Sequence, residues 1–88
     1  MSTGEERLWA LAQQNADQGD YAQAELVIKD IRAKFGETEK VLFFLGEMAR
    51  LQGQPSHAEH YYQSCLRLNP LSLPARKMLA LLYRQQRG

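Results

Sequence analysis

Residues 42–70 read LFFLGEMARLQGQPSHAEHYYQSCLRLNP, and this stretch decides the fold. Apolar residues recur at helical spacing on both sides of Gly53, and a glycine suits the left-handed position just after a helix. Asn69 and Pro70 then mark the end of the second helix, because proline does not continue a helix easily. The stretch therefore predicts two antiparallel helices joined by a short turn.

The same pattern occurs 34 residues earlier in the chain. At this offset identical residues coincide, among them Leu8 and Leu42, Leu11 and Leu45, Gly19 and Gly53, and Ala24 and Ala58. The sequence predicts a single all-α domain over residues 1–88, with repeats at 5–38 and 39–72 and a partial repeat at 73–88. Five helices are expected near residues 5–18, 21–34, 39–52, 55–68 and 73–86. Their expected N-terminal caps are Thr3, Asp20, Thr38, Ser56 and Ser72.

Residues 42–70 resemble a tetratricopeptide repeat. The resemblance is carried by Leu45, Gly46, Gly53, Ala58, Tyr62 and the closing Leu68-Asn69-Pro70. The first repeat is similar through Leu11-Ala12, Gly19-Asp20-Tyr21 and Ala24, but it ends in Phe35-Gly36 instead of an Asn-Pro pair. The resemblance implies a right-handed stack of antiparallel helix hairpins, an α-solenoid of about two and a half repeats. It also implies that the first helix of each hairpin lines a concave groove that binds a protein or peptide.

On this basis the groove should be lined by one side of each first helix. The predicted partner-binding residues are Trp9, Gln13, Phe43, Glu47, Arg50, Lys77, Leu81 and Arg84, with Glu6, Asp17 and Lys40 on the same surface. Trp9 and Phe43 lie 34 residues apart, so we expect them to be stacked neighbours that anchor a partner; packing in the core is the alternative. An amphipathic helix or an extended apolar segment is the expected partner, which would make the chain a scaffold or a chaperone-like adaptor.

The last predicted helix offers an alternative binding surface. Met78, Leu79, Leu82 and Tyr83 give it more apolar residues than one buried stripe needs. We therefore expect Met78, Leu82 and Tyr83 to form an interface with a second copy or with another subunit. Under this alternative the chain is a structural repeat module that assembles through its C-terminal helix.

No residue pattern points to catalysis, a cofactor or a metal. His57 and His60 could supply two metal ligands, but no third ligand accompanies them in the sequence. Cys65 coincides with Ile31 at the repeat offset, which indicates a core position rather than a nucleophile. The chain is therefore expected to be neither an enzyme nor a cofactor-binding protein.

Charge and hydropathy restrict the partners further. The net charge of +1 provides no general field for nucleic acid, so nucleic-acid binding is the weakest alternative. Its basis is a group of basic residues near Tyr83: Arg67, Arg76, Lys77, Arg84 and Arg87. The longest apolar run, residues 41–45, is far shorter than the roughly 20 residues that cross a bilayer, so no membrane span is expected. A single cysteine and the lack of a secretory signal favour the cytoplasm.

Overall fold

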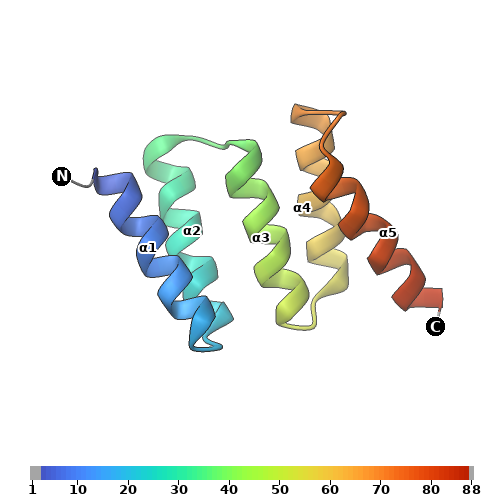
Figure 1. Ribbon diagram of the computed structural model, residues 1–88, viewed down its shortest axis with the longest axis horizontal. Coiled ribbons are helices and arrows are strands. Elements are labelled where there is room, and N and C mark those ends of the chain that lie inside the picture. The colour runs from blue at the N-terminus through green and yellow to red at the C-terminus, as the bar shows by residue number, and fades with distance from the viewer. Residues whose placement is uncertain (1–2, 88) are drawn as a thin grey trace.

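The computed structural model describes residues 3–87, with side chains for residues 3–86. These residues form five helices and no strand (Figure 1). The helices are α1 (Gly4–Asp17), α2 (Tyr21–Phe35), α3 (Glu39–Leu51), α4 (Pro55–Leu68) and α5 (Leu73–Arg87). The predicted all-helical class is confirmed, and every predicted boundary lies within one residue of the observed one. Within residues 3–87, no helix combines the length and the apolar character that crossing a membrane requires.

Side chains cap the starts of α1, α2 and α3. The hydroxyl oxygens of Thr3 and Thr38 and a carboxylate oxygen of Asp20 each accept a hydrogen bond from the backbone N–H three residues later, at 3.1–3.2 Å. These bonds satisfy donors that the start of a helix leaves free. The predicted cap at Ser56 is wrong, because α4 begins at Pro55 and no described side chain caps it. Proline at the first helical position has no N–H group that would need a partner.

The turns that close the α1–α2 and α3–α4 hairpins have the same geometry. Gly19 and Gly53 have φ angles of 80° and 74°, a left-handed conformation that favours glycine. In the first turn the backbone N–H of Asp20 donates a hydrogen bond to the carbonyl oxygen of Asn15, and in the second turn that of Gln54 donates to Ala49. Both bonds are 2.9 Å long. The repeat in the sequence is therefore present in the backbone of the two turns.

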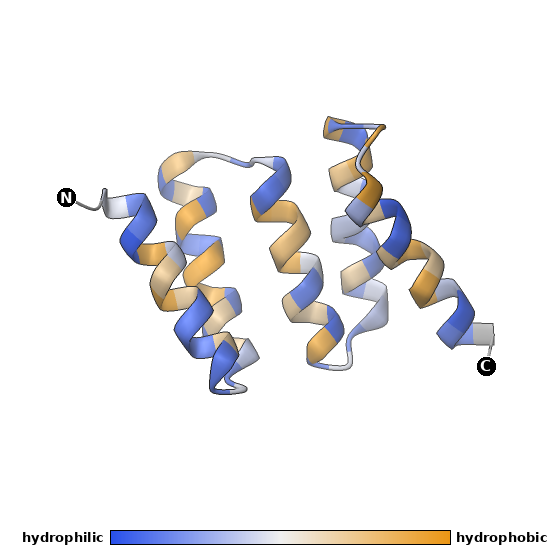
Figure 2. Ribbon diagram, in the orientation of Figure 1, coloured by the Kyte–Doolittle hydropathy of each residue, from blue (hydrophilic) through white to orange (hydrophobic). Residues whose placement is uncertain are grey.

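The helices pack in chain order and form a flat, elongated molecule of 45 × 28 × 18 Å. α3 lies between the α1–α2 hairpin on one side and α4 on the other (Figure 1). Its buried residues belong to two cores: Val41, Leu45 and Met48 pack with α1 and α2, whereas Leu42 and Ala49 pack with α4 and α5. Hydrophobic and hydrophilic residues alternate along the helices (Figure 2), so each helix can turn an apolar face toward a neighbour.

α3 and α4 approach closely at Gly46. A Cβ atom on Gly46 would lie 2.6 Å from Cε1 and 2.8 Å from Cδ1 of the Tyr62 ring. Tyr62 is fully buried, and its hydroxyl group donates a hydrogen bond to Oε1 of Glu47 at 2.6 Å. The first repeat has Ala12 and Ile28 at the corresponding positions. The second repeat therefore combines a smaller residue on one helix with a larger ring on the other.

α5 buries part of its predicted assembly interface. Ala75, Leu79 and Leu82 belong to the core that α5 shares with α3 and α4, and Leu82 is only 1% exposed. These residues are spaced four and three positions apart, so they share one face of the helix. The prediction that Leu82 lies on an external interface is therefore wrong. Tyr83 is 43% exposed and Met78 is half-buried, so both reach the surface.

Candidate functional site

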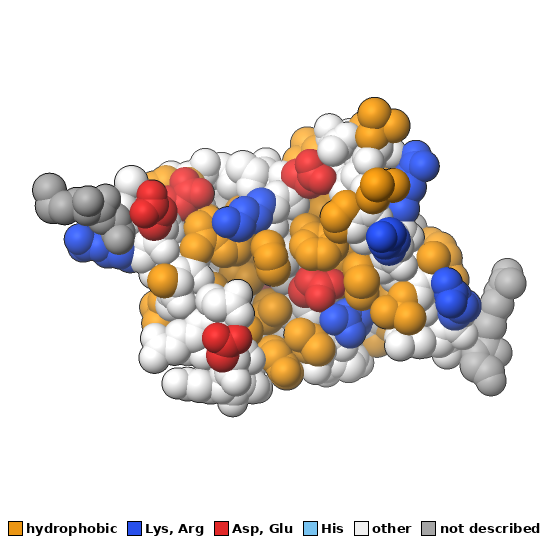
Figure 3. Space-filling view, in the orientation of Figure 1, with side chains coloured by type: hydrophobic (Ala, Val, Ile, Leu, Met, Phe, Trp, Pro, Cys, Tyr) orange, Lys and Arg blue, Asp and Glu red, His pale blue; other side chains and the backbone are white. Residues whose placement is uncertain are grey.

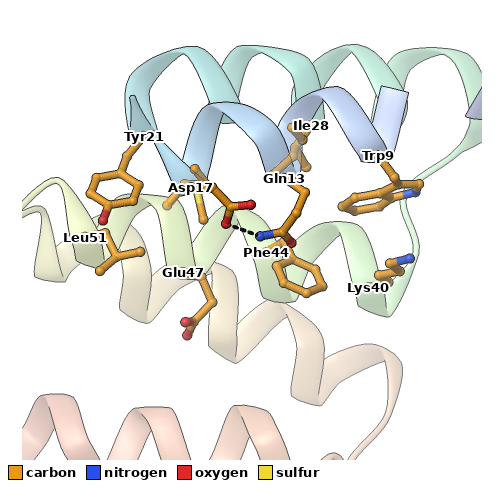
Figure 4. A pocket seen from close by; sticks show the side chains of 12 residues that line it. Trp9, Gln13, Asp17, Tyr21, Ile28, Lys40, Phe44, Glu47 and Leu51 are labelled. Atoms are coloured by element: carbon orange, nitrogen blue, oxygen red, sulfur yellow. Dashed lines mark hydrogen bonds between the residues drawn. The ribbon is translucent and has the colours of Figure 1, made fainter. Parts of the chain in front are cut away.

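A groove lies between α1 and α3, with side chains of α2 contributing to its lining (Figure 4). Its volume is about 400 Å³, and most of its lining is apolar. We call it the α1–α3 groove. The lining residues are Trp9, Ala12, Gln13, Ala16, Asp17, Tyr21, Ile28, Lys40, Phe44, Glu47, Met48 and Leu51. Hydrophobic side chains gather over the middle of the face formed by α1, α3 and α5, with a few acidic and basic groups among them (Figure 3).

Two aromatic rings from opposite helices meet in the groove. The centroids of the Trp9 and Phe44 rings are 5.6 Å apart in an edge-to-face arrangement. The Nζ atom of Lys40 lies 4.4 Å from the centroid of the Trp9 ring, a cation–π contact, and the indole N–H donates to Glu5 at 3.3 Å. The predicted stacking of Trp9 on Phe43 is wrong. On α3 it is Phe44 that points toward α1. Successive residues of a helix point about 100° apart, so Phe43 points in another direction.

Phe43 lies on the same face of the molecule but in a second hollow. Its ring centroid is 5.4 Å from that of Phe44 and 5.8 Å from that of Tyr62. The second hollow, of about 330 Å³, lies between the start of α3 and the start of α5. Lys40 and Phe44 line both hollows, so the two adjoin.

The groove has few polar side chains, and two of the charged ones form no ion pair with another side chain of residues 3–86. Gln13, a predicted binding residue, donates a hydrogen bond from Nε2 to Oδ1 of Asp17 at 2.8 Å. Among residues 3–86, no cation pairs with Asp17 and no carboxylate pairs with Lys40. Both charges therefore remain available to a group from outside the chain.

The third charged residue of the lining is Glu47, and its carboxylate accepts hydrogen bonds from two side chains of the same protein. Its Oε1 atom accepts the bond from the Tyr62 hydroxyl at 2.6 Å, and its Oε2 atom accepts a bond from Nη2 of Arg50 at 3.0 Å. Burial, followed by the hydrogen bond and the charge of Glu47, raises the pKa of Tyr62 well above its ordinary value of 10.0. Arg50 does not line the groove; it lines a separate hollow with Pro55 and Leu82. Arg50 thus compensates the charge of Glu47.

The three predicted binding residues on α5 lie outside the α1–α3 groove. Lys77 is exposed and Leu81 is half-buried. Arg84 lines a shallow hollow on α5 with Ala80 and Tyr83. The structure thus brings together five of the residues predicted for this surface: Trp9, Gln13, Asp17, Lys40 and Glu47. The lining does not include Glu6, Phe43, Arg50 or the predicted residues of α5.

Sequence reasoning did not name four large apolar residues of the lining as binding residues. These are Tyr21 from α2 and Phe44, Met48 and Leu51 from α3. The three on α3 are spaced four and three positions apart, which places them on one face of the helix. This spacing groups the three residues on one face, but it does not show which neighbouring helix that face contacts.

The structure describes the surroundings of Cys65 and His60, two of the residues considered for chemistry. Burial, followed by the charge of Glu39, raises the pKa of the Cys65 thiol to about 11, so the thiol is protonated at neutral pH and is a poor nucleophile. His60 packs its ring against Tyr61, with centroids 5.9 Å apart. The part of the chain that the structure describes contains no group of three His, Cys, Asp or Glu side chains that could hold a metal ion.

Two of the basic residues near the C-terminus form hydrogen bonds within the chain. Arg67 donates a hydrogen bond to the Ser64 hydroxyl at 2.9 Å, and Arg76 donates one to the carbonyl oxygen of Pro70 at 2.7 Å. The side chain of Arg87 lies outside the described residues.

No protein-family model matches the chain, and no curated protein matches it. The function of the α1–α3 groove therefore has to be inferred from its own residues.

Proposed function

We propose that this chain is a protein-interaction module that binds an apolar helix or an extended peptide of another protein in the α1–α3 groove. The observation that carries the proposal is the meeting of Trp9 and Phe44 across an open groove whose lining is mostly apolar. Partly exposed aromatic rings bury large areas on binding and often dominate the binding energy. Among the groove residues, Gln13, Asp17 and Lys40 would then orient the partner at the edges of the apolar surface.

The finer architecture is part of the same proposal. We infer a right-handed stack of hairpins similar to the tetratricopeptide family, with α1, α3 and α5 as the first helices of successive units. The matching glycine turns and the packing of helices in chain order support this inference. In such a stack the groove between α1 and α3 is the natural place for a partner, because two first helices face each other there.

The proposed module is not an enzyme, and we place it in the cytoplasm. A scaffold or a chaperone-like adaptor needs an apolar groove and no reactive group. The high pKa of the buried Cys65 thiol supports this reading, and a lone free cysteine suits a reducing compartment.

Affinity capture from the source cell tests the proposal with a matched pair of variants. The groove variant carries Trp9→Ala with Phe44→Ala. The control variant carries Leu26→Ala with Phe35→Ala, which truncates two residues of α2 that are 57% and 46% exposed and lie outside the groove lining. Circular dichroism checks that both variants remain folded.

The partner captured by the parent chain should be retained by the control and lost by the groove variant. Removal of each anchor ring should weaken binding by about tenfold or more. If the folded groove variant captures the same partner as strongly as the parent, the groove is not the binding surface.

Self-assembly through α5 is a second candidate function. The observation that favours it is the exposure of Tyr83 beside Ala80 on a shallow hollow of α5. Light scattering over a range of concentrations tests it: the parent should associate, and Tyr83→Ser should shift the molecule toward a monomer. A parent chain that stays monomeric at high concentration would exclude this candidate.

A further inference from the structure

The α1–α3 groove lies between two helices that run in the same direction. Figure 1 shows that α1 and α3 begin at the same edge of the molecule and end at the opposite edge. Each helix carries a partial positive charge at its N-terminus and a partial negative charge at its C-terminus. Because the helices are parallel, their dipoles add, and the two ends of the groove differ in potential.

Two charged side chains reinforce this difference. Lys40 lies in the first turn of α3 and Asp17 is the last residue of α1. Each is at the end of its helix where the helix dipole is unfavourable for its charge. Neither has an ion-pair partner among the side chains of residues 3–86. Each placement is unfavourable with respect to the helix dipole, although Lys40 contacts the Trp9 ring and Asp17 accepts a hydrogen bond from Gln13, and both suit a ligand of complementary charge.

Acidic residues in the first turns of α1 and α3, Glu5, Glu6 and Glu39, lie at the same end of the groove as Lys40 and offset part of this potential, but none of them lines the groove. Glu47 is compensated by Arg50, whose Nη2 atom lies 3.0 Å from its carboxylate. Glu5 accepts the hydrogen bond of the Trp9 indole but is not part of the lining. Within residues 3–86, Lys40 and Asp17 are thus the charged residues of the lining that have no ion-pair partner (Figure 4).

The length of the groove fixes the spacing of the complementary charges. Lys40 lies over Trp9, and Trp9 and Asp17 are eight residues apart on α1, a rise of about 12 Å. A helical ligand covers nearly the same length between positions i and i+7, which share one face with i+3 and i+4. The apolar lining between the two charges, with Phe44 and Met48, would contact the residues at i+3 and i+4.

We propose that the groove selects an amphipathic helical segment that lies antiparallel to α1 and α3 and has a defined order of charges. The segment carries Lys or Arg at position i for Asp17, apolar residues at i+3 and i+4, and Asp or Glu at i+7 for Lys40. In this orientation the dipole of the segment also opposes the dipoles of α1 and α3. This inference rests on the proposed function of the groove.

Two model peptides of identical composition test the inference. The forward peptide places lysine at i, leucine at i+3 and i+4, and glutamate at i+7; the reversed peptide exchanges lysine and glutamate. Neither contains tryptophan, so the fluorescence of Trp9, the only tryptophan of the chain, reports binding. Reversal turns two attractive pairs into two repulsive ones, so the forward peptide should bind about tenfold more tightly at low salt. The ratio should shrink in about 1 M salt, where the charges are screened.

A charge-exchanged variant assigns the effect to the two residues. Asp17→Lys combined with Lys40→Glu places each charge at the favourable end of its helix, which offsets the loss of the Lys40–Trp9 contact and of the Gln13–Asp17 hydrogen bond, so this variant should remain folded. It should prefer the reversed peptide by about the same factor. Asp17→Asn alone should reduce the preference of the groove for the forward peptide.

The possible outcomes separate this inference from the proposed function. Equal affinities of the parent for the two peptides would overturn the charge order and leave the apolar groove as a binding site. A forward preference that persists in the charge-exchanged variant would overturn the assignment to Asp17 and Lys40. If neither peptide binds, by fluorescence or by calorimetry, the inference and the proposed function fail together.

Discussion

Replacement of Gly46 by alanine tests the close approach of α3 and α4. At an open position inside a helix this change stabilises a protein by about 1 kcal/mol, because alanine has the higher helix propensity. At Gly46 the added methyl group would lie 2.6 Å from the Tyr62 ring, whereas ordinary contacts begin at 3.4 Å. The ring has little freedom to move, because it is fully buried and its hydroxyl group is bonded to Glu47.

The expected loss of stability follows from these contacts. Insertion of a methyl group into a filled core costs about 1–3 kcal/mol. A shift of the Tyr62 ring would also weaken a hydrogen bond to a charged group, and such bonds contribute about 1.5–3 kcal/mol. When the gain in helix propensity is subtracted from these costs, we expect the free energy of unfolding to fall by about 2 kcal/mol. In a domain of this size, that loss lowers Tm by about 10 °C.

Thermal unfolding followed by circular dichroism measures this effect. Gly4→Ala is the matched control, because the nearest atom to its new methyl group lies at 3.9 Å, and its stability should stay within about 0.5 kcal/mol of the parent. In a Tyr62→Leu background, Gly46→Ala should cost less, because the smaller side chain leaves room for the methyl group. If Gly46→Ala melts at or above the temperature of the parent, the described contact between α3 and α4 is refuted.

Three further predictions concern stability and thiol chemistry. Gly53→Ala should lower the free energy of unfolding by about 1–2 kcal/mol in urea titrations, because its φ of 74° is unfavourable for alanine. Thr38→Ala removes the side-chain cap of α3 and should cost about 1 kcal/mol in the same assay; no change would exclude the cap. The Cys65 thiol should resist alkylation in the native chain at neutral pH and react after unfolding. Its pKa rises from 9.0 to about 11 on folding, so its contribution to stability is full below pH 9 and is lost as the pH approaches 11; Cys65→Ala should lack this loss.

The helices could be predicted from the sequence because their boundaries depend on local signals. Gly19 and Gly53 provide the left-handed residues of the two hairpin turns, and Thr38 provides a cap whose partner is three residues away. None of these signals requires knowledge of distant contacts. The number of helices and the repeat follow from the same residues.

The direction of the aromatic side chains could not be predicted in the same way. Residues 41–45 are all apolar, because α3 is buried between two cores. Such a run contains no polar residue that would distinguish the side facing α1 from the side facing α4. The choice between Phe43 and Phe44 as the neighbour of Trp9 therefore depends on packing between helices. The same holds for Leu82, because apolar residues occupy most positions from Met78 to Tyr83 on α5.

The central position of α3 has a consequence for hydrogen exchange. In residues 3–86, α3 is the only helix that contributes buried residues to both cores. Opening of an end helix disrupts one core and leaves the other intact, so amides of α1 and α5 should exchange before those of α3. A ligand that contacts both α1 and α3 would slow exchange in α1 while leaving α5 unchanged, and a ligand on α5 would do the reverse. The helix whose exchange slows thus reports the side of the molecule that is occupied.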